Sequence, residues 1–170
     1  MKVFLTADTH FGHEKIIEYC ARPFKNVAEM NQVLVENWNA TITRDAVVYH
    51  LGDFIWTRKA IADILPRLNG KIKLVYGGHD FPYLNMYKKY PNITVLSPLA
   101  VENINGTVAV LCHFPLRSWE RKEYGAYHFY GHTHGNLLPL YKSWEVGVDC
   151  NNFYPISLEE AIEKANYLED

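Results

Sequence analysis

Short apolar runs alternate with helix-like segments along the first half of the chain. The runs that are typical of buried strands lie at residues 2–6, 46–49 and 71–76. Helix-like patterns occupy residues 13–19 and 58–68 between them, and Pro66 is expected to end the second of these helices. This alternation of strands and helices predicts parallel βα units.

Two capping boxes mark the starts of amphipathic helices. Asn26 is followed three residues later by Glu29, and Ser157 is followed three residues later by Glu160. After each cap, apolar side chains recur at helical spacing: Met30, Val33, Leu34 and Trp38 in the first helix, and Ala161, Ile162 and Ala165 in the second. Each helix is therefore predicted to have one apolar face.

The second half of the chain has the pattern of a strand-rich region. Strands are expected at residues 93–95, 99–104, 107–112, 127–130 and 144–148. The pair Asn105-Gly106 is typical of a two-residue hairpin turn. Neither half contains a repeat, a low-complexity segment or a linker, so residues 1–170 are expected to form one compact α/β domain.

Composition and charge exclude several classes of protein. The 170 residues are 48% apolar, with 17 basic and 19 acidic side chains and a formal charge of −2, which is ordinary for a globular domain. No apolar run approaches the roughly 20 residues that cross a bilayer, so no membrane partner is expected. Without a run of Lys or Arg, the sequence also predicts no extended surface for nucleic acid.

Cysteine usage and the first residues of the chain bear on the compartment. The three cysteines Cys20, Cys112 and Cys150 are few and odd in number, which argues against a disulfide framework and for a reducing compartment. The first residues contain too short an apolar stretch for a signal peptide. A cytoplasmic location is therefore expected.

Histidine and aspartate recur at the carboxyl ends of successive predicted strands. In chain order these clusters are Asp8-Thr9-His10, Gly52-Asp53, Gly78-His79-Asp80, His113 and Gly131-His132-Thr133-His134. In open α/β sheets, ligands bind at the carboxyl edge of the strands. Five loops are therefore expected to bring metal-type ligands to one rim.

The kinds of ligand in these clusters favour particular metals. Imidazole suits Zn, Fe, Ni and Cu, whereas carboxylate suits harder ions and can bridge two of them. Mixed Asp and His ligation without thiolate favours Mn, Fe or Zn over a structural zinc site. Each cluster alone is a weak signal, but five in order after five strands are a specific one.

The order of these clusters resembles the signature of calcineurin-like metallophosphoesterases, D-x-H, G-D, G-N-H-D, H and G-H-x-H. The resemblance spans residues 8–134, and the length of the chain is similar to that of small bacterial and phage members without a capping domain. It implies an α/β fold, namely a four-layer α/β/β/α sandwich with two mixed sheets. It also implies a hydrolase with a binuclear metal centre.

Carried over to this sequence, the resemblance implies a role for each residue of the motifs. Asp8, His10 and His134 would hold the first metal ion, and Asp53 would bridge both ions. His113 and His132 would hold the second ion, and His79 would be catalytic, stabilising the phosphoryl charge or protonating the leaving oxygen. Two divalent ions are expected as cofactors, with Mn first and Fe, Zn or Ni as alternatives.

One position departs from the family pattern, because Gly78 stands where the family has a metal-ligating asparagine. Glycine has no side chain to coordinate anything, so the second metal site is expected to be weaker. Three explanations stay open at this point: a natural variant with another ligand such as Asp80, an inactivating substitution, or a naturally impaired member. Gly77-Gly78 also suits a turn that needs a positive φ.

Other residues near the rim are candidates for contact with substrate. His13 would reach substrate or support a ligand, and Arg22 and Arg117 would bind phosphate, for which guanidinium is well suited. Trp56 and Trp119 are candidates for stacking on a base or an aryl group. The expected partner is a small phosphoester, with a nucleotide as one candidate.

The function expected from the resemblance is hydrolysis of a phosphodiester by a hydroxide that bridges two metal ions. Diesters are favoured over monoesters by analogy with the small family members and not by a residue. The alternative is a non-catalytic scaffold or interaction module on the same fold, and a third hypothesis is hydrolysis of a non-phosphate ester. A scaffold has no reason to keep the ligand set, and only Gly78 favours it.

Overall fold

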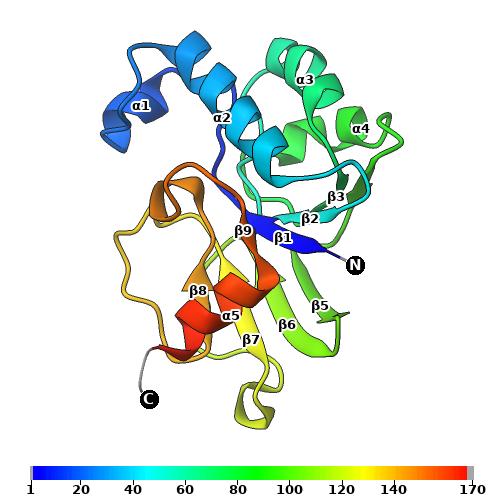
Figure 1. The fold of residues 1–170 in the computed structure, drawn as a ribbon, viewed down its shortest axis with the longest axis vertical. Coiled ribbons are helices and arrows are strands. Elements are labelled where there is room, and N and C mark those ends of the chain that lie inside the picture. The colour runs from blue at the N-terminus through cyan, green and yellow to red at the C-terminus, as the bar shows by residue number, and fades with distance from the viewer. Residues whose placement is uncertain (1, 168–170) are drawn as a thin grey trace.

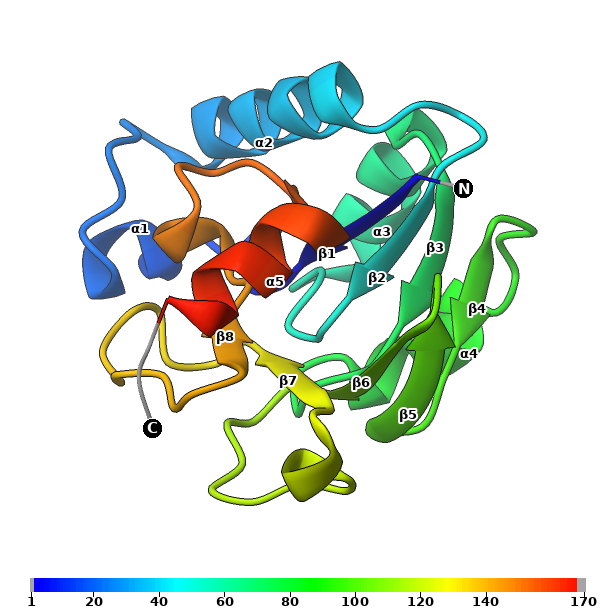
Figure 2. The same cartoon turned by 60° about the horizontal axis from the view of Figure 1, so that its bottom comes forward.

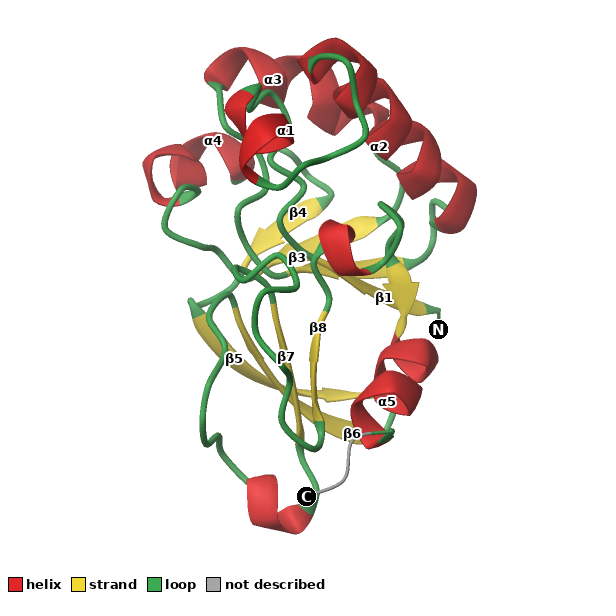
Figure 3. Ribbon diagram, turned by 90° about the vertical axis from the view of Figure 1, so that its left-hand side faces the viewer, coloured by secondary structure: helices red, strands yellow, loops and turns green. Residues whose placement is uncertain are grey.

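A computed structural model describes residues 2–167 of the chain. Within this range, two β-sheets lie face to face, and four helices cover the outer face of the first sheet (Figure 1). These helices are α1 (Lys15–Tyr19), α2 (Val27–Thr41), α3 (Arg58–Ile64) and α4 (Leu84–Tyr87). Figure 3 shows the layers edge-on, with the helices above the two sheets.

The first sheet contains the three strands predicted in the first half of the chain, one predicted in the second half and one that was not predicted. Its order is β4 (Ile93–Val95), β3 (Lys71–Leu74), β2 (Val47–His50), β1 (Val3–Thr6) and β9 (Ile156–Ser157). The strands β1 to β4 pair in parallel, whereas β9 pairs antiparallel to β1. The predicted parallel βα units are confirmed, while the two-residue strand β9 was not predicted.

The second sheet has the order β5 (Leu99–Ile104), β6 (Thr107–Cys112), β7 (Tyr127–Tyr130) and β8 (Ser143–Glu145). The pair β5 and β6 is antiparallel, and β6, β7 and β8 run parallel. The β5–β6 hairpin turns at Asn105 and Gly106, whose φ values of 52° and 91° are those of a type I′ turn. The carboxyl ends of β6 and β7 therefore open toward the same edge.

Alternating side chains along the central strands fill two separate cores. In β2, Val48 faces the helices and packs in a core with Trp38 of α2, whereas Tyr49 faces the second sheet. Leu111 and Phe129 of the second sheet meet that inner face. Because both faces of the first sheet are buried, its strands have the continuous apolar runs that the sequence displays.

The helix α5 (Leu158–Asn166) closes one edge of the sandwich against β1, β8 and β9, as Figure 2 shows. The outer face of the second sheet is covered by the 113–126 loop, which includes a short 3-10 helix, η3 (Lys122–Tyr124). There Trp119 and Ala126 pack on Val110 of β6. The α/β sandwich with two mixed sheets is thus confirmed.

Several local predictions are also confirmed, and others need correction. The side chains of Asn26 and Ser157 accept hydrogen bonds from the N–H groups of Glu29 and Glu160, which confirms both as N-caps, while the carboxylate of Glu29 accepts from the N–H of Lys25. The helix expected over 58–68 ends as α-helix at Ile64 and continues as the 3-10 helix η1 (Leu65–Arg67), because Pro66 removes a donor. The last predicted strand is shorter than 144–148, since its end forms the 3-10 helix η4 (Val148–Cys150).

Between β3 and β4, residues 81–87 form the 3-10 helix η2 (Phe81–Tyr83) followed by α4. None of the described helices combines the length and the apolar character that a membrane crossing requires.

Candidate metal centre

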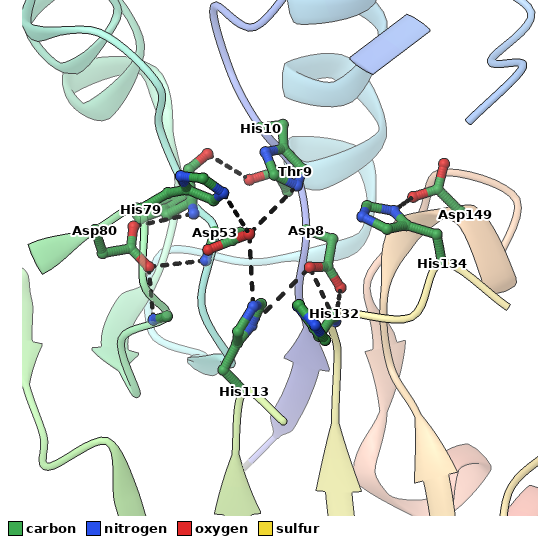
Figure 4. Close-up of polar contacts among 12 residues, drawn as sticks. Asp8, Thr9, His10, Asp53, His79, Asp80, His113, His132, His134 and Asp149 are labelled. Carbon is green, nitrogen blue, oxygen red and sulfur yellow. Dashed lines mark hydrogen bonds and ion pairs between the residues drawn. The ribbon is translucent and has the colours of Figure 1, made fainter. Parts of the chain in front are cut away.

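Five loops bring the predicted ligands together at one edge of the sandwich (Figure 4). Three of them follow β1, β2 and β3 of the first sheet, and two follow β6 and β7 of the second. The strands that precede these loops run parallel within each sheet, so all five loops leave at the same edge. The sequence prediction of a single rim is therefore confirmed by the placement of these side chains.

Two groups of side chains at this rim have the geometry of metal ligands. The first is Asp8, His10 and His134, and the second is Asp8, Asp53 and His113. Within each group, one ligand atom per residue lies within 4.8 Å of the others. Asp8 belongs to both groups, so its carboxylate lies between the two positions where an ion would bind.

Asp53 occupies the centre of the rim. Its Oδ2 atom lies 3.6 Å from Nε2 of His10, 3.5 Å from Nε2 of His113 and 3.8 Å from Nε2 of His79. Burial acts to raise the pKa of Asp53, but its contact with His113 and the nearby imidazoles hold it below the ordinary value. Asp53 is therefore an anion that faces both ligand groups, as the predicted bridging role requires.

Asp8 is fully buried and is fixed by the loop that contains His132. The backbone N–H of His132 donates to Oδ1 and Oδ2 of Asp8 at 3.1 and 2.9 Å. Burial raises the pKa of Asp8 to about 7, so without a nearby cation this carboxyl group would be partly protonated at neutral pH. A carboxylate in this environment is a strong ligand for a cation that would compensate its charge.

His132 is held beside the second group and outside both groups of ligand atoms. Its ring centroid lies 5.1 Å from that of His113 and 4.6 Å from that of Phe114. Its role as a metal ligand stays a prediction, whereas the hydrogen bonds from its backbone to Asp8 are present.

The tautomer of His113 follows from its surroundings. Nδ1 lies 2.8 Å from the carbonyl oxygen of Leu51, and because that oxygen only accepts, Nδ1 carries a proton whether the ring is neutral or charged. Burial acts to lower the pKa of His113, but Asp53 and Asp8 raise it to about 9. With Nδ1 engaged, Nε2 is the atom that faces Asp53 and would ligate a metal.

His134 is oriented by a carboxylate that sequence reasoning missed. Nδ1 of His134 lies 2.7 Å from Oδ2 of Asp149, which is located in η4. The pKa of Asp149 is below its ordinary value despite burial, because His134 and Arg22 both bond to it. The carboxylate therefore accepts from Nδ1 and leaves Nε2 of His134 for a metal.

Arg22 is buried behind the site, so its predicted contact with phosphate is wrong. Its Nε and Nη2 atoms donate to the two oxygens of Asp149, both at 2.8 Å. The remaining donors reach the carbonyl oxygens of Asp8 and Thr9 and the sulfur of Met30. All five N–H groups of the guanidinium are engaged, and none is left to bind a substrate.

Two further buried carboxylates, Asp80 and Glu145, stabilise the ligand loops by accepting hydrogen bonds from their backbone. Asp80 accepts from the backbone N–H groups of Asp53, Phe54 and Gly77 and from the hydroxyl of Tyr87. Glu145 accepts from the backbone of Thr133 and Gly135 and from the Thr133 hydroxyl. The hypothesis that Asp80 replaces the missing asparagine is therefore wrong, because both of its oxygens already serve the backbone.

The backbone at five of the six predicted ligands is left-handed. The φ values are 57° at Asp8, 48° at His10, 53° at Asp53, 76° at His132 and 49° at His134. A non-glycine residue in this region is uncommon and costs about 1–3 kcal/mol, so such residues persist only where the surroundings enforce them and they gather at functional sites. The chain therefore turns sharply at these five ligands, and the local sequence did not predict this geometry.

The residues present fit a metal centre. Nε2 of His10 and Oδ1 of Asp53 are buried and have no hydrogen-bond partner among the described residues. A third set of potential ligand atoms, on Cys20, His134 and Asp149, is less suited to an ion. Both oxygens of Asp149 are engaged by Arg22 and His134, and the guanidinium charge opposes a second cation there.

Adjacent glycines at the third loop have opposite steric environments. A Cβ atom at Gly77 would lie 2.5 Å from Oδ1 of Asp53 and 2.8 Å from Cδ2 of His113. At Gly78, a Cβ atom would meet nothing within 4 Å, and φ is not in the left-handed region. Gly77 is therefore required for the loop to approach the ligands, whereas Gly78 would accept a side chain and is not needed for a turn of positive φ.

The remaining candidates lie on two sides of the rim. His13 stacks on Trp56 with ring centroids 3.8 Å apart, and Trp56 also packs on His79 at 4.5 Å. This places His13 and Trp56 beside the candidate catalytic residue. Arg117 lies on the other side, on an exposed loop, and Trp119 is buried in the outer core and cannot stack on a ligand.

Comparisons with known proteins give relatives of this chain but no activity. No protein-family model matches it. The chain is 36% identical over 168 residues to the uncharacterized protein MJ1445 of Methanocaldococcus jannaschii, covering 93% of this chain and 88% of that protein. It is 28% identical over 163 residues to the Gene 66 protein of Mycobacterium phage D29, covering 80% of each.

A solved structure has the same fold. The crystal structure of the protein of unknown function AQ665 from Aquifex aeolicus matches with a TM-score of 0.77 and 25% sequence identity. The match covers 96% of this chain and 98% of that one. The arrangement of two facing sheets is therefore shared over the whole length of both proteins.

Proposed function

This chain belongs to the same protein family as MJ1445 of Methanocaldococcus jannaschii, and we propose that it is a metal-dependent phosphoric ester hydrolase. Within these hydrolases, we propose that the chain is a calcineurin-like metallophosphoesterase, because the motifs from Asp8 to His134 occur in the order of that class. Phosphodiesters are the proposed substrates.

The observation that carries this proposal is the pair of ligand groups that meet at Asp8. Two groups of three ligand atoms, each within 4.8 Å, provide places for two ions, and Asp53 lies between His10 and His113. When bound, two divalent ions would activate water and stabilise the charge of the phosphoryl oxygens. Two carboxylates do not neutralise two divalent cations, so the loaded site would attract an anionic ester.

The protein itself contributes orientation and proton transfer. Asp149 fixes the ring of His134 and the Leu51 carbonyl fixes that of His113, so neither ligand has to reorient when an ion arrives. His79 is half exposed, with a side-chain exposure of 54%, and its Nε2 atom lies near Asp53. This position suits contact with a phosphoryl oxygen or donation of a proton to the leaving oxygen.

The open side of the rim supports diesters over monoesters. His79 and Gly78 are exposed, so a second ester group on the phosphorus would have room to project. Imidazole and carboxylate donors without thiolate favour Mn, with Fe, Zn or Ni as alternatives. The cysteines Cys20, Cys112 and Cys150 are unpaired, which suits the proposed reducing location in the cytoplasm.

The test compares this chain with Gly78→Asn and Gly78→Ala in Mn²⁺-dependent hydrolysis of bis(p-nitrophenyl) phosphate. Open space at Gly78 means that both variants should fold, and only asparagine adds an oxygen ligand. We expect Mn²⁺-dependent release of p-nitrophenolate, with Gly78→Asn the most active of the three. The monoester p-nitrophenyl phosphate, assayed in parallel, checks the preference for diesters.

Each outcome bears on a different part of the proposal. Equal activity of the three proteins would mean that glycine at position 78 does not weaken the binding of the second metal ion. If the monoester is turned over faster, the preference for diesters is wrong. Absence of turnover in all three would overturn the phosphoesterase proposal in favour of a scaffold on the same fold.

A further inference from the structure

A cavity of about 450 Å³ lies on the outer face of the second sheet. It is bounded by the loop after β6 and by the loop that connects β7 to β8. Tyr130 lies at its base, since Phe129 points between the two sheets and its neighbour in the strand points outward. Cavities of this size are typical of sites for small molecules.

The cavity adjoins the candidate metal centre along the chain. Two residues of the cavity wall are close in sequence to predicted metal ligands: Pro115 comes two residues after His113, and Tyr130 comes two residues before His132. In each pair, the Cα atoms are therefore within about 7 Å of each other. Phe114, which lies between His113 and Pro115 in the chain and is 48% exposed, packs its ring on that of His132 with centroids 4.6 Å apart. A molecule bound at the metal centre could therefore extend past Phe114 into the cavity.

Apolar side chains form most of the cavity wall. The aliphatic residues are Leu116, Leu137, Leu138 and Leu140. Three of them are unusually exposed for leucine, at 47% for Leu137, 90% for Leu138 and 43% for Leu140. A contiguous group of exposed leucines beside a cavity is uncommon on a soluble domain and indicates a binding site.

Polar groups in the cavity wall are few. The hydroxyl of Tyr130 is buried beneath the floor of the cavity, and the hydroxyl of Ser143 is already bonded to the backbone of Leu140. Arg117 is exposed and forms no ion pair within residues 2–167, and Lys122 lies with Nζ 4.9 Å from the ring centroid of Trp119.

We infer that this cavity binds the non-reacting arm of the phosphodiester, and that this arm is an alkyl or aryl group. The inference rests on the proposed function and names the substrate class of the same site. The leucines would contact the apolar arm, and Arg117 and Lys122 would attract the negatively charged ester. A nucleobase fits less well, because most of the wall is aliphatic and the Ser143 hydroxyl is already bonded to the backbone of Leu140.

The test uses three diesters that share p-nitrophenolate as the leaving group. The non-reacting arm is methyl, hexyl or thymidine 5′-yl, and kcat/KM is measured with Mn²⁺ for each ester. Leu137→Ser removes part of the wall, and Leu99→Ser is the matched control, because Leu99 of β5 is 46% exposed and lies outside the cavity. We expect kcat/KM for the hexyl ester to exceed that for the methyl ester at least tenfold.

We expect that ratio to fall toward one in Leu137→Ser and to be retained in Leu99→Ser. A binding measurement provides a second readout, in which hexyl phosphate is titrated into the full chain loaded with diamagnetic Zn²⁺. Amide resonances of Tyr130, Leu137, Leu138 and Leu140 are expected to shift in ¹H–¹⁵N spectra.

The outcomes separate this inference from the proposed function. Equal kcat/KM for the methyl and hexyl esters would overturn the inference and leave the phosphodiesterase in place. A preference for the thymidine ester would replace the alkyl arm with a nucleoside. If no ester is hydrolysed, the proposed function fails, and the titration then decides alone whether the cavity binds an alkyl phosphate.

Discussion

The imidazole of His134 donates from Nδ1 to the carboxylate of Asp149 at a distance of 2.7 Å, and so presents Nε2 to the first ligand group. Asp149→Asn keeps the shape of this side chain and removes its charge. We expect Mn²⁺ affinity to fall about 10- to 100-fold, the usual effect of losing such a partner of a metal ligand. Titration calorimetry of the metal-free protein measures it, with exposed Asp63→Asn as the control.

Arg22 is expected to stabilise the folded protein, because its guanidinium is buried and bonded to Asp149. Arg22→Ala leaves that carboxylate without its cation, which costs about 3–5 kcal/mol when a buried pair is broken. Urea unfolding of the metal-free protein measures this loss, and the exposed Arg44→Ala should change stability by less than about 0.5 kcal/mol. A raised KM at unaltered stability would restore the idea that Arg22 contacts substrate.

Gly77 and Gly78 are expected to respond in opposite ways to the same substitution. In Gly77→Ala the added methyl group collides with Asp53 and His113, so the loop must move and metal affinity should fall at least tenfold. In Gly78→Ala the methyl group meets open space, and affinity and stability should match those of the parent chain. Calorimetric titration with Mn²⁺ on both variants tests the pair. Similar losses in the two would contradict the packing described for this loop.

The left-handed backbone at the ligands predicts an unusual order of stability. At His10, with φ of 48°, glycine should be better tolerated than alanine by about 1 kcal/mol, since only alanine is strained there. Thermal unfolding of metal-free His10→Gly and His10→Ala measures the difference. Ala28, exposed within α2, is the control, because Ala28→Gly should destabilise the helix by about 1 kcal/mol.

A buried histidine away from the metal centre predicts part of the pH dependence of stability. His128 lies with Nδ1 3.0 Å from the Val110 carbonyl and accepts at Nε2 from the Leu116 N–H. Burial lowers its pKa from 6.5 to about 4, so between these values the unfolded chain binds a proton that the folded chain does not. Its contribution is complete above pH 6.5 and is lost as the pH falls toward 4.

The variant His128→Gln isolates this effect. Near pH 5, the free energy of unfolding of the parent should change more steeply with pH, by up to about 1.4 kcal/mol per pH unit. Urea unfolding of both metal-free proteins from pH 4.5 to 7.5 measures the two slopes. Identical slopes would mean that folding does not lower the pKa of His128.

Local signals explain why much of the fold could be predicted from the sequence. The caps at Asn26 and Ser157 and the hairpin at Asn105 depend on side chains within three residues of each other. The parallel units follow from apolar runs that are buried on both faces. By contrast, the two-residue strand β9 has too few residues to produce a pattern, and it forms because β1 has a free edge beside it.

The sequence predicted the metal ligands of the site but not the residues, such as Asp149, that orient those ligands. Parallel strands send their carboxyl ends to one edge, so Asp8, Asp53 and His113 were predictable from order alone. Asp149 lies 15 residues after His134, in a 3-10 helix of which only the first residue, Val148, was expected to belong to a strand. Arg22 points inward because the chain turns back after α1, and a surface arginine near the rim has the same local sequence.

The left-handed turns at the ligands also determine how an ion would enter the site. Backbone hydrogen bonds join Asp8 to Gly52, His10 to Asp53 and Gly131 to His113, so the left-handed turns are tied to neighbouring ligand loops, and we expect the chelating shape to form without an ion. Loading would then involve exchange of water and protons for metal with almost no ordering of the chain. We expect it to leave the far-UV circular dichroism unaltered and to show a heat-capacity change near zero. The site would behave as a rigid receptor, whose choice among ions depends on their size and on how readily they lose water.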